Sequence, residues 1–160
     1  PDWGAIPAPN RPADGAPVGP VAALPVFPDH VPLADADMPE ADFRLVTAPA
    51  HSFLNSTFNE TPSSRNREAR PAVLLHPSDA ARLGIADGDP VRLSNARGAV
   101  RLHAAVFDGI RPGVLVSEGI WPNYAFPDGA GINTLVGADP VAPYGGAAFH
   151  DVNVRLSRAA

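Results

Sequence analysis

A dense set of neutral polar side chains lies in one short stretch of the 160-residue sequence. Its members are Thr47, His51, Ser52, Asn55, Ser56 and Thr57. Hydroxyl, amide and neutral imidazole groups both donate and accept hydrogen bonds, whereas a hydrolytic site needs a positioned acid and base. The stretch therefore indicates contacts to a large polar heterocycle or to phosphates rather than hydrolysis. A solvated loop is the alternative interpretation.

Two further features suit the same kind of ligand. Arginines at positions 65, 67 and 70 follow the polar stretch, and their guanidinium groups either attract an anion such as a pyrophosphate or are simply solvated. Asn133 lies between the apolar residues Ile132 and Leu135, a setting that predicts a partly buried, hydrogen-bonded amide. That amide could serve the backbone or the edge of a purine- or pterin-like ring.

The sequence lacks the motifs of several familiar sites. It has no cysteine, which excludes disulfides, thiolate zinc sites, iron–sulfur clusters and a cysteine nucleophile. The five histidines show neither H-x-x-x-H nor H-E-x-x-H spacing, and there is no G-x-S-x-G, P-loop or G-x-G-x-x-G. His76 is predicted to cap the helix that follows it, and His103 to be a packed or surface residue.

The elements that must position these residues follow from the alternation of apolar and polar residues. Strands are predicted at 43–48, 72–76, 90–95, 99–107, 114–118 and 152–156, a short helix at 77–83, and long irregular segments at 49–70 and 119–151. Many short strands joined by glycine turns favour a closed β-barrel, because closure leaves no exposed strand edge. The unit G-I-x-x-G occurs at 84–88 and again at 109–113, either by chance or because the barrel has two related halves.

Composition divides the chain into a proline-rich acidic arm, residues 1–42, and a body, residues 43–160. The arm has ten of the 20 prolines and a net charge of −6, and the body has a net charge of +1. Closely spaced prolines rule out helix and ladder strand, so the arm is either a disordered linker or an extended arm that docks on another domain. The acidic net charge of the chain argues against nucleic-acid binding. The sequence contains no run of about 18 apolar residues, so membrane insertion is not expected. Because the sequence begins with Pro1, we expect a processed protein or a fragment.

Several motifs together resemble a known family. In order they are H-S-F-L-N-S-T-F, P-S-D-A-A-R-L-G-I-A-D-G-D-P-V-R-L-S-N-A-R-G, G-I-R-P-G-V, I-N-T-L and A-F-H-D. Over about residues 43–157 the chain resembles the C-terminal molybdopterin dinucleotide-binding domain of the dimethyl-sulfoxide-reductase superfamily. The resemblance implies a mainly β fold with short helices, a six-stranded double-psi β-barrel. It also implies a bis(molybdopterin guanine dinucleotide) cofactor that carries molybdenum or tungsten.

The resemblance also implies which residues contact the cofactor. They are Thr47, His51, Ser52, Asn55, Ser56, Thr57, Trp121, Asn133, Phe149 and His150. Two positions depart from the family pattern: His150 stands where a lysine is commoner, and Pro49 stands where several relatives have an arginine. The family's metal ligand and clusters lie in other domains, so we expect no catalytic or metal-ligating residue in this chain.

We therefore interpret the chain as the C-terminal cofactor-binding domain of a molybdenum or tungsten oxidoreductase, inactive alone and completed by the preceding domains of its parent enzyme. A cytoplasmic rather than a periplasmic location is expected, in a bacterium. The alternative is a stand-alone double-psi barrel that acts as an adaptor or substrate-binding module. A small self-contained barrel enzyme is disfavoured because no catalytic cluster is recognisable.

Overall fold

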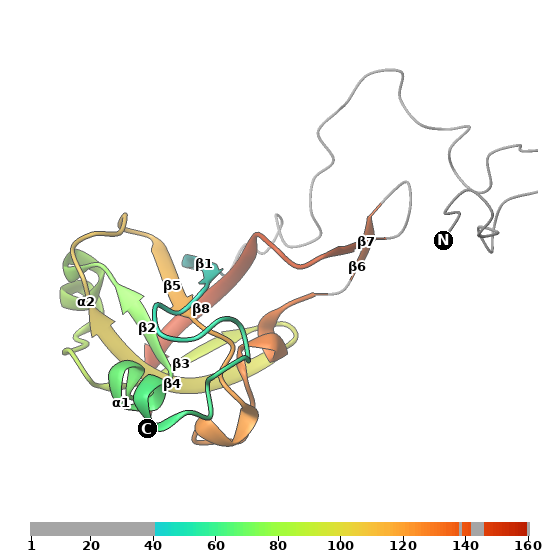
Figure 1. Ribbon diagram of the computed structural model, residues 1–160. Coiled ribbons are helices and arrows are strands. Elements are labelled where there is room, and N and C mark those ends of the chain that lie inside the picture. Colours follow the sequence, from blue (N-terminus) through green and yellow to red (C-terminus); the bar gives the residue numbers. More distant parts are fainter. Residues whose placement is uncertain (1–40, 138, 142–145, 160) are drawn as a thin grey trace, which may run out of the picture.

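A closed barrel of six strands forms the centre of the structure, a computed structural model that describes residues 41–137, 139–141 and 146–159 (Figure 1). Its strands are β1 (Phe43–Ala48), β2 (Ala72–Leu75), β3 (Pro90–Asn95), β4 (Gly98–Val106), β5 (Val114–Glu118) and β8 (Val152–Arg158). The helices are α1 (Pro62–Glu68), α2 (Pro77–Leu83) and the 3₁₀ turns η3 (Asn123–Ala125) and η4 (Ile132–Leu135). A two-stranded ribbon, β6 (Asp139–Val141) and β7 (Gly146–Ala148), extends away from the barrel (Figure 1). Most of the predicted arm lies outside the described residues.

The barrel interior is filled by the apolar residues of each alternating strand. In β8, for example, Val152, Val154 and Leu156 are buried, whereas the residues between them are half-buried or exposed. The largest fully buried side chains are Leu75, Leu93, Leu102, Leu115, Leu135, Val73, Val91, Val100 and Val154. Alternate residues of each strand thus point into the barrel, and the burial of their apolar side chains is the main source of stabilisation of the fold.

The strand order around the barrel is β1–β5–β2–β4–β3–β8, and β8 pairs again with β1. The β1–β5 and β2–β4 pairs are parallel and the other four are antiparallel. In chain order, the first three barrel strands are β1, β2 and β3, and the last three are β4, β5 and β8. Exchanging the first three with the last three leaves the neighbours and the directions of all pairs unchanged. The barrel therefore consists of two interlocked halves, which confirms the predicted double-psi β-barrel.

The repeated G-I-x-x-G unit in the sequence does not correspond to the structural repeat of the two halves. The unit at 84–88 precedes β3, and the unit at 109–113 precedes β5. Under the exchange of halves, β3 corresponds to β8 and β5 corresponds to β2. The two units therefore occupy non-equivalent places, although each one ends in a turn that leads into a strand.

The prediction of an irregular segment at 49–70 was wrong in one respect, because the segment contains α1. The helix starts after Thr61 with Pro62 in its first turn, a common start signal. Seven residues are too few for a helix that is stable alone, so its formation depends on tertiary contacts. The expectation for His76 is confirmed, since its Nδ1 accepts a hydrogen bond from the Ser78 N–H at 3.2 Å, at the start of α2.

The parallel pairing of β1 and β5 places their carboxyl ends side by side. Gly119 directly follows β5, and its N–H donates to the carbonyl of Ala48, the last residue of β1, at 2.8 Å. Gly119 has φ +76°, and a Cβ there would lie 2.5 Å from the Phe53 ring and 2.9 Å from Ala50 Cβ. The irregular segments that follow the two strands are therefore in direct contact, and this contact requires glycine at position 119.

Gly119→Ala should destabilise the chain more than Gly129→Ala does. Both positions have positive φ, which costs about 1–2 kcal/mol for alanine. Gly129 has no atom within 4 Å of the added methyl, whereas the methyl at 119 overlaps Phe53 and adds an overpacking cost of roughly 1–3 kcal/mol. Urea unfolding of both variants measures the difference. Equal free energies of unfolding would contradict the contact between the two segments.

Candidate functional site

The polar segment after β1 forms a tight turn at its centre. Leu54 and Thr57 exchange two main-chain hydrogen bonds, of 3.2 Å from the Leu54 N–H and 2.7 Å from the Thr57 N–H. Asn55 and Ser56 form the tip, and Asn55 has φ +49°, a conformation that asparagine tolerates better than most residues. The side chains of Asn55, Ser56 and Thr57 are exposed. Their polar groups are therefore available to a ligand.

Helix α1 fixes the start of this segment through the main chain of Ser52. The Ser52 N–H donates to Glu68 Oε1 at 2.6 Å, and Ser64 Oγ donates to the Ser52 carbonyl at 2.8 Å. Ser64, which is 7% exposed, also accepts a hydrogen bond from Thr61 Oγ1 at 2.9 Å. Buried polar groups that are satisfied in this way give a single defined arrangement. The main chain of the loop is thus held in place at Ser52, although most of its side chains are exposed.

Trp121 supports the loop from the interior. It is 7% exposed, and its ring meets the Phe53 ring edge-on, with a centroid separation of 5.1 Å and an interplanar angle of 84°. This geometry is the one that aromatic pairs prefer. The structure thus places this predicted contact residue in the core beneath the loop. Its assignment to the cofactor stays a prediction.

Two hydrogen bonds join the loop to the segment after β5. Asn59 Nδ2 donates to the Ile120 carbonyl at 3.2 Å, and the Tyr124 hydroxyl donates to the Glu60 carboxylate. This hydrogen bond raises the pKa of Tyr124 above its ordinary value; desolvation and the Glu60 charge add to the rise, and Arg65 opposes it. The contact with Glu60 therefore favours the protonated hydroxyl of Tyr124.

The expectation that Asn133 is partly buried was wrong. Asn133 is exposed, whereas Ile132 is 4% exposed and Leu135 is fully buried. In a 3₁₀ turn, residues three apart share one face, so Ile132 and Leu135 both enter the core and Asn133 points outward. Its side chain makes no hydrogen bond to the residues that the structure describes. Among these residues, the amide is thus uncommitted and exposed.

Asn95 fixes η4 to the barrel, and sequence reasoning missed it. Its Nδ2 donates to the Leu135 carbonyl at 2.8 Å, and its Oδ1 accepts from the N–H groups of Arg97 and Gly98 at 2.9 and 3.3 Å. A Cβ at Gly98 would lie 2.7 Å from Thr134 Cγ2, so the turn and η4 are in close contact. The motif S-N-A-R-G offered a signal, since asparagine often organises the turn that follows it.

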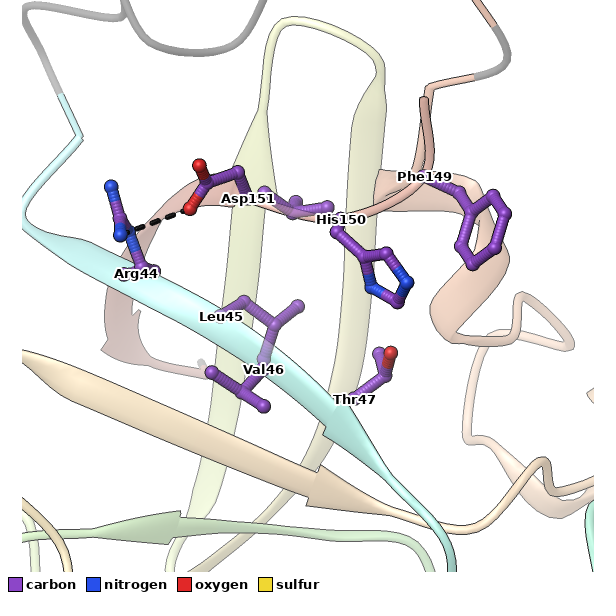
Figure 2. Close-up of a pocket in the computed structure, with 8 residues that line it drawn as sticks. Arg44, Leu45, Val46, Thr47, Phe149, His150 and Asp151 are labelled. Carbon is purple, nitrogen blue, oxygen red and sulfur yellow. Dashed lines mark ion pairs between the residues drawn. The ribbon is translucent and has the colours of Figure 1, made fainter. Parts of the chain in front are cut away.

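A groove of about 290 Å³ lies between β1 and the residues that lead into β8 (Figure 2). Its lining residues are Arg44, Leu45, Val46, Thr47, Phe149, His150, Asp151 and Val152. Thr47 and His150 point toward one another across the groove, and Arg44 pairs with Asp151 at 3.0 Å (Figure 2). The Phe149 and His150 rings lie 4.4 Å apart, and Phe149 is 52% exposed. Three predicted contact residues, Thr47, Phe149 and His150, thus meet here.

Nine of the ten predicted residues fall into three groups, and the tenth, Trp121, lies in the core. His51, Ser52, Asn55, Ser56 and Thr57 belong to the loop after β1; Thr47, Phe149 and His150 line the groove at the end of the same strand; Asn133 is presented separately by η4. Arg65, Arg67 and Arg70 are exposed.

His103 is partly buried, and its pKa is lowered chiefly by desolvation and then by Arg70.

The described part of the chain holds neither a candidate metal site nor a membrane-spanning helix. Across 41–137, 139–141 and 146–159, His, Asp and Glu form no group of three that could hold a metal ion. No helix among the same residues is long and apolar enough to cross a membrane. The candidate residues carry hydroxyl, amide, imidazole and aromatic side chains, which can bind and orient a polar heterocycle.

Comparison with known proteins gives a family. Residues 43–153 match the model of the family described as "Molydopterin dinucleotide binding domain". The "Probable oxidoreductase YoaE" of Bacillus subtilis is 39% identical over 84% of this chain and 19% of its own length. The dimethyl sulfoxide/trimethylamine N-oxide reductase of Rhodobacter capsulatus is 39% identical over 56% of this chain and 12% of its own.

A solved structure shares the fold. The acetylene hydratase from Pelobacter acetylenicus superposes with a TM-score of 0.62 over 75% of this chain and 19% of its own, at 16% sequence identity. The chain thus spans less than one fifth of the length of each of these three proteins.

Glu68→Ala should release the loop after β1 locally. The substitution removes the acceptor of the Ser52 N–H, and an unpaired, partly buried N–H costs about 1–3 kcal/mol. We expect faster hydrogen exchange at the Ser52 amide, measured by NMR, with the β3 and β4 amides unchanged. The matched control is Glu118→Ala, which removes an exposed carboxylate at the end of β5. Unchanged exchange at Ser52 would contradict the role of α1.

Proposed function

The chain belongs to the molybdopterin dinucleotide-binding domain family, and we propose that it covers a bis(molybdopterin guanine dinucleotide) cofactor carrying molybdenum or tungsten in its parent protein. The bound cofactor would supply the redox chemistry. The guanine form, the metal and the oxidoreductase activity of the parent are parts of this proposal. The relatives named as oxidoreductases support it.

The observation that carries the proposal is the set of exposed, uncommitted polar groups on rigidly held segments. The side chains of Asn55, Ser56 and Asn133 are exposed and make no hydrogen bond to any residue within the described ranges. The segments that carry them are nonetheless fixed, by α1 in one case and by Asn95 in the other. A solvated surface has no need of such fixation, whereas a binding site gains affinity from preorganised groups.

The residues present suit a pterin dinucleotide. Neutral amide and hydroxyl groups match the donors and acceptors of a pterin or purine ring, and the exposed arginines after the loop suit its phosphates. Thr47 and His150 face the groove, and the Phe149 ring offers an apolar surface to a planar ring. The chain would thus bind and orient the cofactor and exclude water from it, while the parent's other domains hold the metal.

The partner that this role requires is the rest of the parent polypeptide. The matched relatives are at least five times longer than the aligned segment, so this domain is a small part of each of them. A stand-alone adaptor, the alternative from the sequence, has no use for preorganised polar loops. We therefore favour a cofactor-covering domain that acts together with the preceding domains and lacks reductase activity when isolated.

The parent protein should copurify with molybdenum or tungsten and release GMP on mild acid hydrolysis. Asn133→Ala in the parent should lower both, because the ring edge that the amide contacts would lose its partner, at a cost of roughly 1–3 kcal/mol. Metal analysis and nucleotide chromatography measure the occupancy.

Ser157→Ala, an exposed change on β8, is the matched control and should retain full occupancy. A parent without metal and nucleotide would refute the proposed function. A loaded parent whose occupancy is unaffected by Asn133→Ala would refute only the role of that residue.

A further inference from the structure

The direction of the main-chain groups along β1 follows from two hydrogen bonds. The Arg44 N–H donates to the Gly113 carbonyl at 3.0 Å, and the Ala48 carbonyl accepts from the Gly119 N–H at 2.8 Å. Both bonds point toward β5. Because the N–H and C=O of one residue lie on the same side of a strand and alternate from residue to residue, the main chain of Thr47 points to the opposite side, toward β8.

Strand β8 does not reach Thr47. The β1–β8 ladder runs from the Phe43–Val154 pair to the Leu45–Val152 pair and stops there. Asp151, the next residue, has φ +65°, which turns the chain out of the strand, and its carboxylate pairs with Arg44. Continued pairing would have placed His150 opposite Thr47. Instead, the N–H and C=O of Thr47 face the groove and have no partner among the described residues.

The opening admits one small planar group rather than another strand. Val46 and Ala48 direct their main-chain groups to β5, and Leu45 is already paired with Val152. Thr47 is therefore the only β1 residue after Leu45 whose main-chain groups point toward the groove. A strand added to an edge needs donors and acceptors from several alternate residues. A single donor beside a single acceptor instead matches the N–H and C=O of one cyclic amide.

The rest of the groove suits the ring that carries such an amide. The His150 side chain lies across the groove from Thr47, with the exposed Phe149 ring beside it (Figure 2). Aromatic rings offer a face or an edge to a planar heterocycle. The pterin and the guanine of a molybdopterin guanine dinucleotide both contain a cyclic amide, so the two share the chemistry that this opening selects.

We propose that the main chain of Thr47 binds the cyclic amide edge of a pterin or guanine ring, through its N–H as donor and its C=O as acceptor. This inference rests on the proposed function and adds to it a recognition element that does not depend on the side chain. The early end of the β1–β8 ladder is then the feature that creates the binding edge.

Thr47→Pro and Thr47→Val in the parent protein separate the main chain from the side chain. Proline removes the hydroxyl and the N–H that faces the groove but no hydrogen bond of the β1–β5 ladder, because that ladder uses the N–H groups of Arg44, Val46 and Ala48. Valine removes the hydroxyl and keeps the N–H. We measure cofactor retention as pterin and GMP per protein. We expect it to fall roughly tenfold in Thr47→Pro and by no more than about twofold in Thr47→Val. Equal losses would overturn the proposal.

Hydrogen exchange in the unaltered parent tests the same point if the proline variant does not fold. The Thr47 amide should exchange fast in cofactor-free protein and become at least tenfold more protected in loaded protein, whereas the Val46 and Ala48 amides should be protected in both. Protection of Thr47 in the cofactor-free parent would mean that a polypeptide segment occupies the edge, and would overturn the proposal. So would fast exchange in both forms.

A third sample identifies the ring. Parent protein loaded with molybdopterin that lacks the nucleotide should protect the Thr47 amide if the pterin binds there, and should leave it unprotected if the guanine does. A parent that takes up no pterin in any form would instead refute the proposed function itself.

Discussion

The parallel pairing of β1 with β5 is the constraint on which the rest of the site depends. It brings together the carboxyl ends of two strands that are far apart in sequence, so the segments that follow them must leave from the same end of the barrel. Phe53, Trp121 and Gly119 then fill the space between those segments. The same pairing consumes the main-chain groups of alternate β1 residues and directs those of Thr47 to the other side.

Polar side chains that are not candidates for ligand contact fix the segments that are. Glu68 and Ser64 bind both main-chain groups of Ser52, and Asn95 binds the Leu135 carbonyl beneath Asn133. Each of these interactions is partly buried, so losing one partner leaves a desolvated group unpaired. The exposed groups of the site can therefore stay uncommitted while the backbone that carries them is fixed. A preorganised binding surface requires both kinds of residue: those that fix the backbone and those whose polar groups remain available to the ligand.

Much of the fold could be predicted from sequence because strand alternation is local information. The alternating residues of β3, β4 and β8 indicated strands, and every buried residue in these strands is apolar. Helix α1 could not be predicted, since its seven residues have weak helical preference and depend on contacts such as that of Ser64 with Ser52. The exposure of Asn133 was mispredicted for a related reason: its apolar neighbours were visible, but the three-residue period of η4 that turns the amide outward was not.

The sequence alone determined the barrel class, the family resemblance and the residue types that could contact a pterin dinucleotide, because these depend on local alternation and on motif order. The tertiary structure decided which of those residues meet. It placed Trp121 in the core, brought Thr47 beside Phe149 and His150, and ended the β1–β8 ladder at Leu45. The physical reason is that these outcomes depend on strand register and on pairing between residues as far as 111 positions apart, such as Phe43 and Val154, which no local pattern records.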